Sequence, residues 1–210
     1  MQYRRISADC HLDLPWLPPD LFTSQATREF KDRMPYVEDG ADGPRWVTKK
    51  GVFMGIPGAV GSVGAPFVPG QNYRVDKMAE TGLYEAGKRG ERRPGDPHLR
   101  IKEMEKDGVD AEIIFGILGV VSRLEDHEAA NECLRIYNDF LKDFCSHYPD
   151  RQIGLACLPY GDIAAAAKEV HRVAKMGLRG LELSCSWDME PMWHPMWDPL
   201  WQAVNDVQLP

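Results

Sequence analysis

In the second half of the chain, apolar residues alternate between helical spacing and short continuous runs. Helical spacing occurs in four segments, at 99–107, about 125–147, 162–177 and from 198 onward. Continuous apolar runs occur at 111–118, 153–158 and 178–184 and predict strands buried on both faces. Strands that alternate with helices and are apolar throughout indicate a parallel α/β sheet.

Residues that typically start and stop helices support these boundaries. Asp96 and Asp162 precede two of the helical segments and are N-cap candidates. Gly108 and Gly177 follow the same two segments, where glycine accepts the left-handed conformation of a C-cap. We therefore expect helices that end just before these two glycines.

The first half is less regular. A short strand pattern covers residues 6–11, and a long loop or insertion region follows from about 15 to 95. Within it we predict a short hairpin around Arg45, Trp46 and Val47, followed by a Gly/Pro-rich tract at 51–70. The whole chain, 1–210, then forms a single domain of about four strand-then-helix units.

Such units build either an open doubly wound sheet or a barrel. The first strand is not followed by Gly-x-Gly-x-x-Gly, the phosphate-binding fingerprint of a dinucleotide fold. Polar residues follow the first and fourth strands instead, namely Asp9, His11, Cys185 and Ser186. Because catalytic groups of a barrel lie at the carboxyl ends of its strands, this pattern favours a barrel.

Asp9 and His11 are the candidate metal ligands. Side chains alternate along a strand, so these two point the same way and Cys10 points the other way. A carboxylate beside an imidazole offers oxygen and nitrogen donors that suit Zn²⁺ or a neighbouring first-row ion. An accidental Asp-x-His is the alternative that the motif alone leaves open.

Composition narrows the classes of partner. The chain has 210 residues and a formal net charge of −7, which argues against binding to nucleic-acid phosphates. Five dispersed cysteines without a Cys-x-x-Cys pair indicate reduced thiols, and the start of the chain lacks a secretory signal pattern, so we expect a cytoplasmic protein. The Gly/Pro-rich tract leaves no apolar helix to span a membrane.

Several short motifs, in order along nearly the whole chain, resemble the amidohydrolase-related branch of the amidohydrolase superfamily. This branch contains aminocarboxymuconate semialdehyde decarboxylase and the resorcylate and carboxyvanillate decarboxylases. The motifs are Ser7-Ala8-Asp9-Cys10-His11, Leu99-Arg100 through Met104, Asp107-Gly108-Val109-Asp110, Arg151-Gln152-Ile153-Gly154, Leu158-Pro159, Gly177-Leu178-Arg179-Gly180 and Asp198-Pro199-Leu200-Trp201.

The resemblance implies a TIM-type (β/α)₈ barrel with a divalent metal and no organic cofactor. Asp9 and His11 match the metal pair of the first strand, and the family's other ligands are a His from strand five and an Asp from strand eight. Leu209 and Pro210 match the point where strand five would begin, so the chain resembles about the first four units, truncated before that strand. We expect it to be poorly stable alone unless it self-associates, because its edge strands are unpaired. The family resemblance also suggests a homodimer.

The resemblance also implies a reaction. The first expectation is non-oxidative decarboxylation of an aromatic or unsaturated carboxylic acid, with Zn²⁺ as the first choice of metal and Mn²⁺ as the second. Metal-dependent hydrolysis of an amide, ester or C–C bond is one alternative, and a non-catalytic fragment or interaction module is another.

Four further residues are candidate contacts for a small carboxylate or aromatic substrate. Cys185, Ser186 and Trp187 follow the fourth strand and should face the barrel mouth. Arg45 lies where the decarboxylases place a cation, although a solvated hairpin explains it as well.

Overall fold

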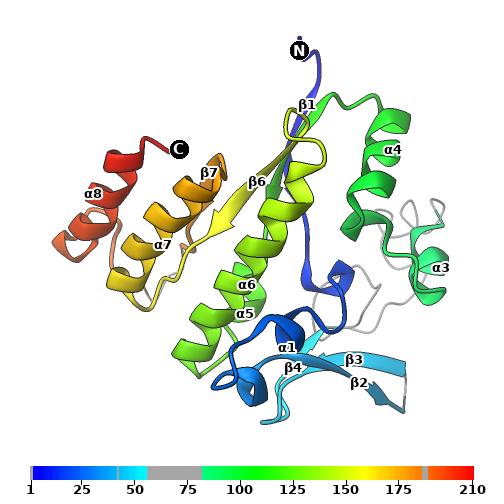
Figure 1. Ribbon diagram of the computed structural model, residues 1–210, viewed down its shortest axis with the longest axis horizontal. Coiled ribbons are helices and arrows are strands. Elements are labelled where there is room, and N and C mark those ends of the chain that lie inside the picture. The colour runs from blue at the N-terminus through cyan, green and yellow to red at the C-terminus, as the bar shows by residue number, and fades with distance from the viewer. Residues whose placement is uncertain (1, 42, 56–81, 186–188) are drawn as a thin grey trace.

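The computed structural model describes residues 2–41, 43–55, 82–185 and 189–210 (Figure 1). Four strands form a parallel sheet in the order β1-β5-β6-β7. They are β1 (Ile6–His11), β5 (Ala111–Phe115), β6 (Gln152–Cys157) and β7 (Gly180–Glu182). The main helices are α4 (Pro97–Asp107), α6 (His127–Ser146), α7 (Ile163–Met176) and α8 (Asp198–Val207).

The order of the strands in the sheet follows their order along the chain. A doubly wound sheet reverses its strand order at a switch point, whereas a barrel adds each strand beside the previous one. The predicted parallel α/β sheet is therefore confirmed, and its order is that of part of a barrel. The carbonyl of Pro210 also accepts a hydrogen bond from the Leu181 amide at 2.9 Å, beside β7.

The predicted helix boundaries are confirmed where their caps are local. The Asp96 carboxylate accepts hydrogen bonds from the amides of His98 and Leu99, both at 2.9 Å, at the start of α4. Gly108 ends α4 and Gly177 ends α7 with positive φ angles of 66° and 90°. A side chain larger than hydrogen would strain the backbone at both positions.

Two predicted strands are shorter than expected. The strand predicted at 111–118 ends at Phe115, and the chain turns into the short helix α5 (Leu118–Val121). The strand predicted at 178–184 is reduced to β7, because the Leu178 amide completes the end of α7 by donating to the Val173 carbonyl at 3.1 Å. Apolar runs reveal burial but do not show where strand pairing stops.

The region from 15 to 95 contains more regular structure than the sequence indicates. Its elements are η1 (Leu14–Trp16), α1 (Leu21–Gln25), η2 (Lys31–Arg33), β2 (Tyr36–Gly40), β3 (Gly43–Val47), β4 (Phe53–Gly55), α3 (Leu83–Lys88) and η3 (Arg93–Gly95). The hairpin predicted around Arg45, Trp46 and Val47 is confirmed, and β4 extends it to a three-stranded antiparallel sheet. Trp46 is fully buried and packs edge-on against Phe22, with ring centroids 5.9 Å apart. Most of the tract at 51–70 lies outside the described residues.

The parallel sheet has two unlike faces. On the packed face, Ile114 and Gly154 lie side by side, and a Cβ on Gly154 would come within 2.6 Å of Leu141 of α6. This face also carries Glu112, Gln152 and Ala156, all buried. The open face carries Ile113 and Phe115 of β5 and Ile153 and Leu155 of β6, all only half-buried. Figure 1 shows α6 and α7 running along the same side of the sheet, with the small sheet β2-β3-β4 beyond the carboxyl end of β1.

All five cysteines are free thiols, as expected. In the described part of the chain, no helix has both the length and the apolar character needed to cross a membrane. The remaining short helix, η4 (Pro195–Trp197), leads into α8.

Candidate functional site

Asp9 and His11 lie at the carboxyl end of β1, beside β5. The pairing of β1 with β5 shifts by one residue between Ser7 and Cys10, as in a β-bulge. As a result Ser7 and Cys10 share a face, with Oγ and Sγ 3.0 Å apart. His11 pairs with Phe115, and the two rings stack with centroids 5.8 Å apart, so the imidazole lies on the open face.

The His11 imidazole stands between two carboxylates. Its Nε2 lies 3.2 Å from Oδ1 of Asp9, and its Nδ1 lies 3.5 Å from Oδ1 of Asp13. The Asp9 side chain is 87% exposed and that of His11 is 50% exposed, so both are open to solvent. The predicted placement of Asp9 and His11 on one side of the strand agrees with this contact.

Asp13 is a member of the site that the sequence analysis missed. Burial raises the pKa of its carboxyl group, and the neighbouring His11 opposes that effect. The signal was present in the sequence, because Asp9, His11 and Asp13 stand at alternate positions. A carboxylate that accepts a hydrogen bond from one imidazole nitrogen fixes which nitrogen remains available as a ligand.

The donor set around His11 fits a metal ion in part. A carboxylate and an imidazole are donors that first-row divalent ions accept, and both are accessible. Within residues 2–41, 43–55, 82–185 and 189–210, no three side chains of His, Cys, Asp or Glu are placed to hold one ion. Asp9 and His11 therefore offer two donor groups, fewer than the three or four protein ligands of a zinc-type site.

Glu182 is a second residue that the sequence analysis missed. It lies at the end of β7, where its Oε2 accepts a hydrogen bond from the Gly116 amide at 2.7 Å and lies 3.6 Å from the Cys157 thiol. This carboxylate thus joins the carboxyl ends of β5, β6 and β7. Burial raises the pKa of Glu182, while the Gly116 amide lowers it. A lone acidic residue inside the apolar run at 178–184 was the available signal.

Among the predicted substrate contacts, the described residues Arg45 and Cys185 form no hydrogen bond or ion pair with Asp9 or His11. Arg45 lies on β3 and pairs across the small sheet with Glu38 of β2, at 2.8 Å from Nη2 to Oε1, and the two side chains are 52% and 36% exposed. This is the solvated hairpin that the sequence analysis kept as the alternative. Cys185 is exposed, and Ser186 and Trp187 lie outside the described residues.

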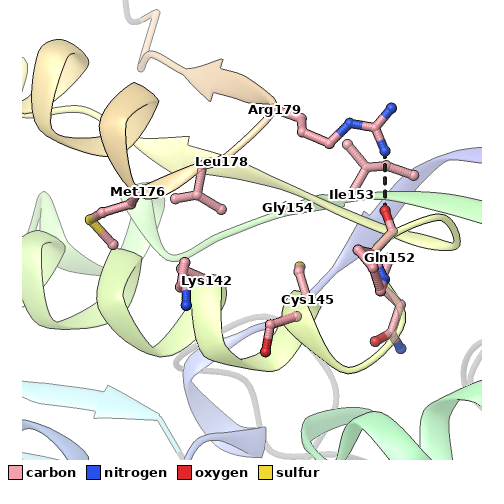
Figure 2. Close-up of a pocket in the computed structure, with 11 residues that line it drawn as sticks. Lys142, Cys145, Gln152, Ile153, Gly154, Met176, Leu178 and Arg179 are labelled. Carbon is pink, nitrogen blue, oxygen red and sulfur yellow. Dashed lines mark hydrogen bonds between the residues drawn. The ribbon is translucent and has the colours of Figure 1, made fainter.

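A cavity of about 250 Å³ lies at the other end of the sheet, by the last turns of α6 and α7 and the first residues of β6 (Figure 2). Its lining includes Lys142, Cys145, Gln152, Met176, Leu178 and Arg179. The Arg179 guanidinium is already engaged, because it donates to the Pro149 carbonyl at 3.1 Å. The side-chain amide of Gln152 is shielded from solvent and has no hydrogen-bond partner. This cavity is at the amino ends of the strands, away from Asp9 and His11.

Comparison with known proteins gives one consistent result. A family model described as amidohydrolase matches residues 8–210. A gamma-resorcylate decarboxylase of Rhodococcus jostii is 34% identical over 83 residues, which is 39% of this chain and 25% of that enzyme.

Solved structures extend the likeness over the full length of the chain. A 5-carboxyvanillate decarboxylase of Novosphingobium aromaticivorans, solved with manganese and 3-methoxy-4-hydroxy-5-nitrobenzoic acid, superposes with a TM-score of 0.60 at 20% identity, covering 99% of this chain and 49% of that one. An amidohydrolase of Mycobacterium avium subsp. paratuberculosis superposes with a TM-score of 0.72 at 20% identity, covering all of this chain and 58% of that one. At this identity the structures show a shared fold, and the chain spans about half the length of each.

Proposed function

Because the chain belongs to the amidohydrolase family, we propose that it is the amino-terminal part of a metal-dependent decarboxylase that acts on a small aromatic carboxylic acid. The observation that carries this proposal is the pairing of Asp9 with His11 at the carboxyl end of β1. In barrels this end of the strands is where reactions take place. The remaining strands of a (β/α)₈ barrel, and the further metal ligands, would come from residues beyond 210.

In this proposal Asp9 and His11 hold the ion. The sequence alone favoured Zn²⁺, but the carboxyvanillate decarboxylase that shares this fold contains manganese, so we propose Mn²⁺ in its place. A bound divalent ion would stabilise negative charge that develops on a substrate carboxylate or ring oxygen. The proposal includes no organic cofactor, as the family resemblance implies.

The other residues of the site have supporting roles. Asp13 orients the His11 ring through Nδ1 and leaves Nε2 directed toward Asp9 and the ion. Phe115 stacks on His11 and offers an apolar surface at the floor of the site, where an aromatic substrate could lie. Glu182 holds the Gly116 amide and so fixes the rim on which the substrate would rest.

The choice of decarboxylation over hydrolysis rests on the relatives. The Rhodococcus protein is a gamma-resorcylate decarboxylase, and the Novosphingobium structure is a carboxyvanillate decarboxylase. An ion held by Asp9 and His11 would also serve hydrolysis of an amide, ester or C–C bond. Three further points remain predictions. They are the role of Cys185, Ser186 and Trp187 as substrate contacts, a cytoplasmic location and a homodimer.

The experiment that tests this proposal measures CO₂ release by the protein that carries this chain, with Mn²⁺ added. The substrates are 2,6-dihydroxybenzoate and 5-carboxyvanillate. We expect His11→Ala to lower the rate by more than about 100-fold, since even outer partners of a metal ligand contribute about 10- to 100-fold. The control is His171→Ala, because His171 is exposed on α7. Release of an alcohol or amine from ester or amide substrates, without CO₂, would favour the hydrolase; no turnover of either kind would favour a non-catalytic module.

A further inference from the structure

A buried ion pair lies behind the carboxyl end of β1, on the packed face of the sheet. Arg100 of α4 donates to both carboxylate oxygens of Glu112 on β5, from Nε at 2.7 Å and from Nη2 at 3.0 Å. The side chains are 9% and 4% exposed. Burial disfavours the charged form of Arg100, but the pairing with Glu112 outweighs it and raises the pKa of the guanidinium.

The third nitrogen of the Arg100 guanidinium, Nη1, reaches the main chain of His11. Nη1 of Arg100 donates to the carbonyl of His11 at 2.8 Å and to the carbonyl of Pro94 at 3.0 Å. The His11 ring lies on the open face while its carbonyl is held from the helix layer. The next residue is also held, since the Leu12 amide donates to the Phe115 carbonyl at 2.9 Å and the Tyr137 hydroxyl donates to the Leu12 carbonyl at 3.2 Å.

From this geometry we propose that Arg100 is a positioning residue, which sets the orientation of the His11 imidazole by fixing the peptide plane that follows it. The inference rests on the proposed function, because the imidazole is positioned for a metal ion. Glu112 fixes the guanidinium, the guanidinium fixes the His11 carbonyl, and the carbonyl limits the backbone rotation that would swing the ring away from Asp9.

Stability alone accounts poorly for such a pair. Two charges taken out of water lose much of their hydration, and aliphatic residues of similar volume often stabilise a protein as well or better. A guanidinium offers what they lack, a planar fork with donors for a carboxylate and two carbonyls at once. A lysine in the same place is a single point charge and cannot make all four contacts.

The first test compares Arg100→Lys with Arg151→Lys. Arg151 is the matched control, because it also donates to two main-chain carbonyls, those of Asp110 and Val109, and pairs with Glu105, but it stands at the amino end of β6. The metal-free protein is studied by NMR at one fixed pH, with the His11 Cε1–H signal assigned through His11→Gln. The Mn²⁺ dissociation constant is then measured by titration.

We expect Arg100→Lys to shift the His11 signal and to weaken Mn²⁺ binding about 10-fold or more, within the range for outer partners of metal ligands. Arg151→Lys should leave both unchanged. A second variant, Arg100→Met/Glu112→Leu, guards against a simple loss of folding, because it removes both buried charges together. It should remain folded by circular dichroism and still show the shifted signal and the weaker binding.

The outcomes distinguish the positioning role of Arg100 from the proposed metal-dependent function. If both Arg100 variants keep the wild-type His11 signal and Mn²⁺ affinity, Arg100 does not position His11, whatever the protein catalyses. If the His11 signal moves but the wild-type protein binds no Mn²⁺, the positioning holds and the proposed metal-dependent function is overturned.

Discussion

The packed and open faces of the parallel sheet differ in burial and in the residues that they carry. On the packed face Ile114 is fully buried, and Gly154 leaves room for Leu141 of α6 to approach the strand. On the open face Ile113 is half-buried, and the His11 ring is half exposed on top of Phe115. In this chain the helix layer covers the packed face, whereas the open face carries the Asp9–His11 pair of the proposed metal site.

The largest expected effect on stability comes from the packed face, and it can be measured by replacing two adjacent isoleucines of β5. In the 210-residue chain, Ile114→Ala should lower the free energy of unfolding by about 2 to 5 kcal/mol, because it leaves a cavity in the helix-facing core. Ile113→Ala should cost about 1 kcal/mol or less, because the side chain is already partly in water. Urea unfolding measures both, and equal losses would contradict the two-face description.

The next test adds a single methyl group to the packed face. Gly154→Ala places a Cβ 2.6 Å from Cγ of Leu141, so the Leu141 side chain or the helix that carries it must shift, at a cost of about 1 to 3 kcal/mol. Gly119→Ala in α5 is the control, because a Cβ there has no neighbour within 4 Å. Thermal unfolding should separate the two variants clearly. A neutral Gly154→Ala would mean that α6 packs less tightly on the sheet than the structure indicates.

A smaller effect concerns the start of α6, the helix that covers the packed face. The Arg33 guanidinium, with the Ala129 amide, holds the pKa of the Asp126 carboxyl at about 2, against an ordinary value of 3.8, despite some desolvation. A lowered folded-state pKa stabilises the protein above about pH 4, and this contribution is lost as the pH falls toward 2.

Asp126→Asn should therefore destabilise the protein at pH 6 but hardly at pH 2. We expect about 1 kcal/mol at pH 6, since the Arg33 and Asp126 side chains are 30% and 27% exposed and solvent screens the pair. Asp162→Asn at the start of α7 is the matched control, because Asp162 caps the Ala165 amide at 2.9 Å and its carboxylate forms no ion pair with any residue that the structure describes. Its effect should change much less between pH 6 and pH 2, and urea unfolding at both values measures this.

The smallest effect on stability should come from the site itself. We expect His11→Gln to change the free energy of unfolding by less than about 0.5 kcal/mol, because the replaced ring is half in solvent. The same variant should lose Mn²⁺ binding in titration. A loss of several kcal/mol would place His11 among the residues that hold the sheet together, contrary to its position on the open face.

Sequence reasoning succeeded where the signal was local. Asp96 and Gly108 specify α4 through their own neighbours, and the alternation of Asp9 and His11 fixes which way they point. It missed Glu182, whose meaning depends on the Gly116 amide 66 positions away. It likewise could not foresee β4 in the region between 15 and 95, because that strand is added to a hairpin that the buried Trp46 anchors to the core.

The one-residue shift in β1 has a consequence for how this strand can change over generations. Between Ser7 and Cys10 the strand holds one residue more than β5 offers partners for. Loss of the codon for Ala8 would therefore leave a regular strand in which Asp9 and His11 still face the open side. Loss of one codon inside β5 would instead turn every later side chain of that strand to the wrong face. We therefore expect β1 to accept a deletion of Ala8, next to the proposed metal ligand Asp9, and β5 to accept no deletion within its paired residues.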